Sequence, residues 1–144
     1  MQDAVDSLQR FEQRLGRRLA SWGVLSMVAG IAMQAVRDKS WRAFGWQCLG
    51  WGAVDGAIAA VGLASASRPR EAPAERRATG LRRLLLLNAG LDVLYITGGL
   101  MLIRSGRSRP SAVRTGSGAG IAAQGIVLLF FDLAHALFVP QLTK

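Results

Sequence analysis

The stretch from Leu84 to Ile103 constrains the fold of this chain more than any other part of the sequence. Its 20 residues, LLLLNAGLDVLYITGGLMLI, contain a single charged side chain, that of Asp92. A helix of this length rises about 30 Å, which is the hydrocarbon thickness of a bilayer. Because the apolar residues do not keep to one helical face, the stretch predicts a transmembrane helix and not an amphipathic surface helix.

Other apolar runs share this character, so the sequence predicts four membrane spans, at about 19–36, 41–64, 84–103 and 118–139. The polar connector Arg37–Ser40 is short enough to make the first two spans antiparallel neighbours. We therefore expect a single all-α integral membrane domain over residues 1–144, built as a four-helix bundle in the lipid bilayer.

The N-terminal segment, residues 1–18, predicts an amphipathic helix. Apolar side chains recur there at steps of three and four, as Val5, Leu8, Phe11 and Leu15, while arginines occupy the rest of the surface. Such a helix either lies in the membrane interface or extends the first span into water. The predicted fold takes the first form, an interfacial helix ahead of the bundle.

Two connectors carry most of the remaining charge. Residues 65–83 contain two prolines and six arginines, which predicts a solvated loop with room for a short helix at Ala74–Ala78. Residues 104–118 predict a second loop. The run TGSGAG, Thr115–Gly120, resembles a phosphate-binding loop only in composition, because it lacks the Lys-Ser/Thr of a P-loop and follows no predicted strand. We expect it to be a flexible lead-in to the last span.

The net charge of +9 would indicate nucleic-acid binding in a soluble protein. Here the arginines flank apolar spans, so membrane orientation and anionic lipid head groups account for them, and no nucleic-acid partner is expected. The side that holds both termini and the 65–83 connector carries 11 lysines and arginines, against 7 on the other side. This bias predicts a multi-pass protein with both termini in the cytoplasm and anionic lipids at the cytoplasmic face.

Three of the predicted spans carry one aspartate each: Asp55, Asp92 and Asp132. Measured along each helix, all three lie about 10–14 Å from the cytoplasmic boundary. We therefore expect one polar cluster inside the bundle, with further members Asn88, Tyr95 and His135. Three ionised carboxylates cannot share a dry site without compensation, so they are either protonated or accompanied by a cation.

Glycines mark the expected helix contacts. Gly23 and Gly30 are seven residues apart in the first span, and Gly52 and Gly56 form a GxxxG pair in the second. Small residues at these spacings let two membrane helices approach closely, so these four glycines are predicted to pack between helices.

Three segments carry a resemblance to a known family: WGAVDGAIA (Trp51–Ala59), LNAGLDVLYITGG (Leu87–Gly99) and QGIVLLFFDLAHALF (Gln124–Phe138). Together they resemble a family of small bacterial four-span membrane proteins that is known only as a domain of unknown function. The resemblance implies a four-span architecture and a location in the bacterial inner membrane. It implies no activity and no cofactor.

Two kinds of function are compatible with these features. The first is a structural role, as an accessory subunit or assembly protein of a membrane complex, with other membrane subunits or a second copy as partners. In that case the aspartates, with Asn88, Gln47 and Gln124, form hydrogen bonds between helices. The alternative is proton or cation handling through the carboxylates, with Tyr95 and His135 as relay partners.

An enzymatic function is less favoured. The sequence contains no GxSxG, HExxH or Cys–His arrangement. An intramembrane metal site is a third possibility, in which Asp132 and His135 contribute two ligands and Asp55 and Asp92 complete an oxygen-rich set. Because a single histidine cannot form the usual zinc or haem site, no cofactor is expected and the identity of any metal stays open.

Overall fold

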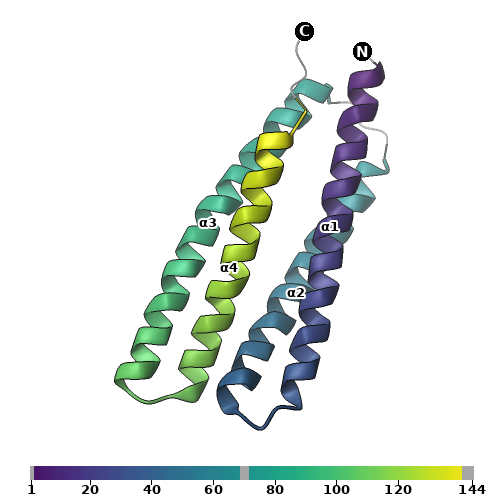
Figure 1. The fold of residues 1–144 in the computed structure, drawn as a ribbon. Helices are drawn as coiled ribbons and strands as arrows, with labels where there is room; N and C mark the ends of the chain where they lie inside the picture. The colour runs from purple at the N-terminus through teal and green to yellow at the C-terminus, as the bar shows by residue number, and fades with distance from the viewer. Residues whose placement is uncertain (1, 69–71, 141–144) are drawn as a thin grey trace.

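A computed structural model describes residues 2–68 and 72–140. Within this part of the chain there are four helices and no strand: α1 (Gln2–Gln34), α2 (Lys39–Ala66), α3 (Ala74–Ser108) and α4 (Ala112–Phe138). They form two antiparallel hairpins, α1–α2 and α3–α4, that lie side by side (Figure 1). The predicted all-α bundle is confirmed.

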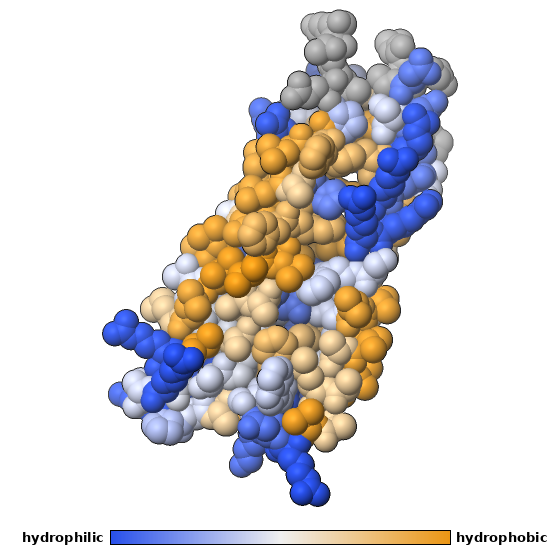
Figure 2. Space-filling model, in the orientation of Figure 1, coloured by the Kyte–Doolittle hydropathy of each residue, from blue (hydrophilic) through white to orange (hydrophobic). Residues whose placement is uncertain are grey.

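Three of these helices, α2, α3 and α4, are long and apolar enough to cross a membrane. Apolar residues cover the middle of the visible face, and charged residues gather towards its two ends (Figure 2). Many large apolar side chains in this region are exposed, for example Leu94 at 65%, Met101 at 69% and Phe130 at 69%. An exposed apolar surface of this extent is unusual for a soluble monomer and fits a lipid environment.

The N-terminal segment is helical, as predicted, but it does not form a separate interfacial helix. Helix α1 runs without a break from Gln2 to Gln34, so the segment is the first half of one long helix. Its residue Leu8 is fully buried and belongs to an apolar cluster with Ala78 and Leu85 of α3, Ala136 of α4, and Val139, the residue that follows α4. The extension of the first span, the other interpretation of the sequence, is therefore the form that the structure shows.

The two predicted loops are much shorter in the structure. Helix α3 begins at Ala74, so most of the 65–83 connector is helical, and the 104–118 connector is reduced to a turn between α3 and α4. The reason is that arginine, leucine and alanine favour helix, and that Pro73 ends the loop directly before the first turn of α3. Arg70 and Lys144, which contribute to the predicted orientation, lie outside the described residues.

Each hairpin is closed by a reciprocal glycine contact. A Cβ on Gly23 would lie 2.8 Å from the carbonyl oxygen of Gly52, and one on Gly52 would lie 2.6 Å from that of Gly23. Gly99 and Gly118 make the same contact between α3 and α4, at 2.6 Å in both directions. The two backbones touch at these points, so a side chain has no room there.

The other predicted packing glycines differ from each other. Gly30 faces the backbone of Gly45, 2.6 Å from the position that a Cβ would take, so it lies in the α1–α2 contact. A Cβ on Gly56 would meet nothing within 4 Å, although the backbone of Gly56 lies against Gly23. Gly56 therefore takes part in the contact only through its main chain.

The two hairpins meet along α2 and α4. A Cβ on Gly116 would overlap the carbonyl oxygen of Ser40, and one on Gly120 would lie 2.6 Å from the Cβ of Gln47. The TGSGAG run is therefore not a flexible lead-in. It forms the first turns of α4, and its glycines let α4 approach both α2 and α3.

Candidate functional site

A cavity of about 250 Å³ brings the three aspartates together. Asp55 comes from α2, Asp92 from α3 and Asp132 from α4, and their exposed fractions are 3%, 3% and 7%. Asn88 and Tyr95 line the same cavity, as their spacing of four and three residues from Asp92 predicts for one helical face. Five of the six residues of the predicted polar cluster thus meet at one place.

Aromatic packing closes one end of this carboxylate cavity. Trp51 of α2 and Tyr95 of α3 meet edge to face, with their ring centroids 4.7 Å apart. Leu19 and Leu128 add apolar surface from α1 and α4. The carboxyl groups therefore share their cavity mainly with apolar and aromatic side chains, and none of the described residues that line it is a lysine, arginine or histidine.

The carboxyl groups have no partner within the described part of the chain. No hydrogen bond or ion pair reaches Asp55, Asp92 or Asp132, and the Oδ2 atoms of Asp55 and Asp92 are fully buried without a partner. A buried polar atom left in this state costs about 1–3 kcal/mol. Native proteins contain few such groups, and they concentrate at functional sites, so the cavity is the candidate site of this molecule.

His135, the sixth predicted member, faces a different direction. Its Nδ1 lies 2.6 Å from the carbonyl oxygen of Phe131, which can only accept, so Nδ1 carries the proton. Its Nε2 lies 3.2 Å from Nη1 of Arg18 and accepts a hydrogen bond from that guanidinium. Among the described residues, the ring forms no hydrogen bond or ion pair with Asp132.

The geometry does not favour the metal-site alternative. Among the described residues, no group of three or more His, Cys, Asp and Glu side chains is arranged so that it could hold a metal ion. The three carboxylates line one cavity, but within the described part of the chain they do not form the set of ligands that a hard cation requires.

The carboxylate cavity is not sealed from the outer surface. Val54 and Ile58 of α2 are 51% and 53% exposed, and Leu91 and Tyr95 of α3 are 40% and 37% exposed, although all four line the cavity. Helices α2 and α3 do not pack closely against each other. The cavity therefore opens sideways between these two helices.

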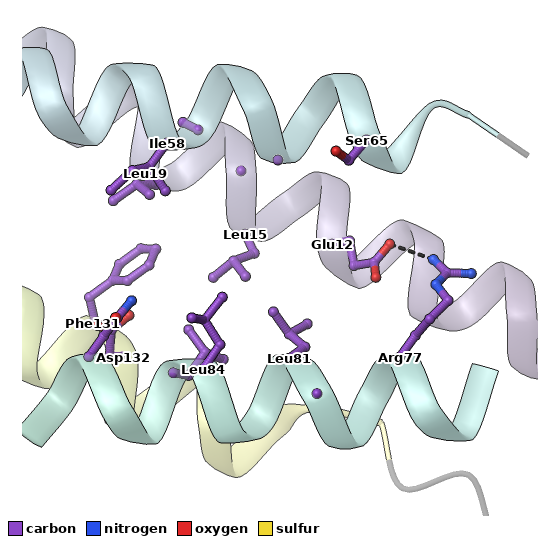
Figure 3. Close-up of a pocket in the computed structure, with 16 residues that line it drawn as sticks. Glu12, Leu15, Leu19, Ile58, Ser65, Arg77, Leu81, Leu84, Phe131 and Asp132 are labelled. Atoms are coloured by element: carbon purple, nitrogen blue, oxygen red, sulfur yellow. Dashed lines mark hydrogen bonds and ion pairs between the residues drawn. The ribbon is translucent and has the colours of Figure 1, made fainter. Parts of the chain in front are cut away.

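A longer groove continues from this opening. A cavity of about 360 Å³ shares Leu19, Ile58, Asn88 and Asp132 with the carboxylate cavity and extends towards the end of the bundle that holds the N-terminus. Figure 3 shows Asp132 at one end of this groove and the ion pair of Glu12 and Arg77, at 2.6 Å, at the other. Between the two ends most of the lining side chains are apolar, among them Leu15, Leu81 and Leu84, so the groove is a mainly apolar channel with a carboxyl group at one end and an ion pair at the other.

The polar contacts that join the hairpins come from residues other than the aspartates. Trp22 donates to Gln124 at 3.2 Å, Gln124 donates to Ser26 at 2.6 Å, and Ser26 donates to the carbonyl oxygen of Cys48 at 3.0 Å. These three successive hydrogen bonds link α1, α2 and α4. The predicted hydrogen bonding between helices is therefore made by Gln124 and not by the aspartates. Gln124 and Ser26 are isolated polar residues in apolar runs, which is the signal that sequence offers for such a contact.

Comparison with known proteins places this architecture in a family. The model of one family, described as a family of unknown function, matches residues 18–133. The matched region contains all three aspartates and leaves out most of the charged first half of α1. No curated protein and no solved structure matches the chain. The chain therefore belongs to the family of unknown function DUF6992.

Proposed function

We propose that this protein is an accessory or assembly subunit of a membrane complex and that it holds a partner's transmembrane helix at the opening between α2 and α3. The observation that carries the proposal is a buried carboxylate cavity that opens sideways and contains carboxyl oxygens without partners. We place the protein in the bacterial inner membrane, with all four helices crossing and both termini in the cytoplasm.

The chemistry of the cavity indicates what kind of partner it fits. In lipid, an uncompensated carboxyl group is costly, and a lysine or arginine on a neighbouring helix removes that cost by ion pairing and hydrogen bonding. The described residues that line the cavity include no basic side chain. A second copy of this chain would bring carboxylates against carboxylates, so the charges favour a different chain with a basic residue within its span.

Proton or cation handling is the second candidate. The observation that favours it is the convergence of three carboxyl groups on one cavity, which continues into a groove towards the bundle end. On this alternative, purified protein in proteoliposomes conducts protons or cations, and Asp92→Asn abolishes the flux while the protein stays folded. If the protein is instead an accessory subunit, neither the wild type nor the Asp92→Asn variant should conduct protons or cations.

Site-directed photo-crosslinking tests the proposed docking site. A photoreactive residue at Ile58, which lines both the carboxylate cavity and the groove, is expected to capture a partner span that contains a lysine or arginine. Val61 is the matched control, because it lies one turn further along α2 and is 68% exposed but lines neither cavity. The Ile58 adduct should disappear in an Asp55→Asn/Asp92→Asn background, and the Val61 signal should not change.

Three results would contradict docking at this opening. They are an adduct formed only with a second copy of the chain, an adduct whose span has no basic residue, and equal capture at Ile58 and Val61. Each would show that the carboxylates do not select the partner.

Cysteine labelling tests the proposed orientation. The α1–α2 and α3–α4 connections lie at one end of the bundle, and the last turn of α2 and the first turns of α1 and α3 lie at the other end (Figure 1). In a Cys48→Ala background, Ser67→Cys should react only from the cytoplasmic side and Ser111→Cys only from the outside. Reaction of both from one side would refute the topology.

A further inference from the structure

A second polar cavity, of about 380 Å³, lies between the first half of α1 and the last turns of α4. Arg14, Arg18 and His135 contribute its polar groups, and Phe11 and Phe138 contribute aromatic walls. It is separate from the carboxylate cavity, with which it shares no lining residue. Its polar groups are basic, so the ligand it fits is an anion.

Two guanidinium groups are available to such a ligand. Arg14 and Arg18 are four residues apart, so they share one face of α1, and both are exposed. Neither forms an ion pair with any carboxylate of the described residues. Arg18 uses one nitrogen to contact His135, which orients the guanidinium and leaves its other donors free.

The position of this cavity fits the level of lipid head groups. The charged half of α1 ends at Arg18 and the apolar half begins at Leu19. On α4, Phe130, Leu137 and Phe138 project outward beside the cavity and are 69%, 74% and 76% exposed. A basic cavity therefore adjoins exposed apolar side chains, which is the arrangement that an anionic amphiphile requires.

We propose that this cavity binds an anionic phospholipid. Its phosphate lies between Arg14 and Arg18, since guanidinium groups bind phosphate oxygens through paired, charge-assisted hydrogen bonds. Its acyl chains run along the outward face of α4 at Phe130 and Leu137. The site is independent of the partner-binding function proposed for the carboxylate cavity.

Lipid titration of the purified full-length protein tests this site. Phosphatidylglycerol is added to detergent-solubilised protein, and bound lipid is measured by native mass spectrometry. An Arg14→Gln/Arg18→Gln variant should bind roughly 30-fold more weakly, which corresponds to about 1 kcal/mol for each arginine near an anionic surface. Arg82→Gln/Arg83→Gln removes two exposed arginines from α3 at the same end of the bundle and should bind like the wild type.

The other probes separate lipid from free phosphate and from general charge attraction. Phosphatidylcholine and inorganic phosphate should each bind at least tenfold more weakly than phosphatidylglycerol. If the two double variants lose phosphatidylglycerol binding equally, the proposal is overturned, because the lipid is then attracted by net charge alone. Tight binding of inorganic phosphate would overturn the assignment of the site to a lipid.

Discussion

Replacing Gly116 with alanine is expected to separate the two hairpins and to leave little folded protein. A Cβ at this position would overlap the main-chain carbonyl of Ser40, which belongs to the first turns of α2. A flexible side chain could move away, but the backbone of a helix cannot do so without shifting the whole element. Overpacking commonly lowers the free energy of unfolding by about 1–3 kcal/mol. We expect the loss for Gly116→Ala to lie at or above the upper end of that range.

Neighbouring glycines give a matched control for this effect. Gly99→Ala should also destabilise the protein, because the new Cβ would lie 2.6 Å from the carbonyl oxygen of Gly118. Gly98→Ala, one residue away on the same helix, adds a Cβ that meets nothing within 4 Å. It should be neutral or stabilise the helix by about 0.4–1 kcal/mol. Thermal unfolding in detergent and the yield of monodisperse protein measure the difference, and equal behaviour of Gly98→Ala and Gly116→Ala would refute the argument.

These glycines also show what the sequence could reveal about the fold. The length and apolarity of the spans were sufficient to predict an all-α bundle, because they depend on local composition. Gly23, Gly30 and Gly52 were identifiable from their spacing. Gly116 was not, because a run rich in glycine and serine is typical of loops, and only the approach of Ser40 from α2 makes it a helix contact. Tertiary contacts determine whether a glycine-rich run forms a loop or a helix that packs closely against another, and these contacts cannot be identified from local sequence.

The candidate site was predictable to a similar extent. Equal depth on three helices was enough to bring Asp55, Asp92 and Asp132 to one cavity. The direction of His135 was not predictable, because its position three residues after Asp132 allows a contact without requiring one. Arg18, which is 117 residues away in sequence, takes that contact instead. The first half of α1, which carries Arg18, packs through Leu8 against side chains that are distant in sequence, and its position therefore depends on tertiary contacts.

Replacing Asp92 with leucine is expected to stabilise the isolated protein and to abolish its function. The carboxyl group of Asp92 is 3% exposed, and its Oδ2 has no hydrogen-bond partner. Removing an unpaired buried polar group and filling the space with an apolar side chain should gain about 1–3 kcal/mol. Asp92→Asn keeps the shape and a polar amide, so its gain should be smaller. Partner capture at Ile58 should be lost in both variants.

Asp38 is the control, since its carboxylate is well satisfied. It caps α2 and accepts hydrogen bonds from the main-chain N–H groups of Ser40, at 2.7 Å, and Trp41, at 3.2 Å. The Ser40 hydroxyl and these N–H groups hold the pKa of Asp38 below its ordinary value, so its contribution to stability is complete above that value and fades as the pH falls through the lowered pKa. Asp38→Ala should therefore lower the thermal unfolding midpoint at neutral pH, which is the opposite sign to Asp92→Leu.

Comparing Asp92→Leu with Asp38→Ala shows whether Asp92 serves a binding site or stabilises the bundle. If Asp92 held the bundle together, Asp92→Leu would lower the unfolding midpoint as Asp38→Ala does, and loss of partner capture would follow from unfolding. If Asp92 is kept for a partner, the same variant unfolds at a higher temperature and still fails to capture the partner span. A functional site commonly carries groups that destabilise the free protein, because their interactions are completed only in the bound state. A lowered midpoint for Asp92→Leu would therefore count against the carboxylate cavity as the place where the partner binds.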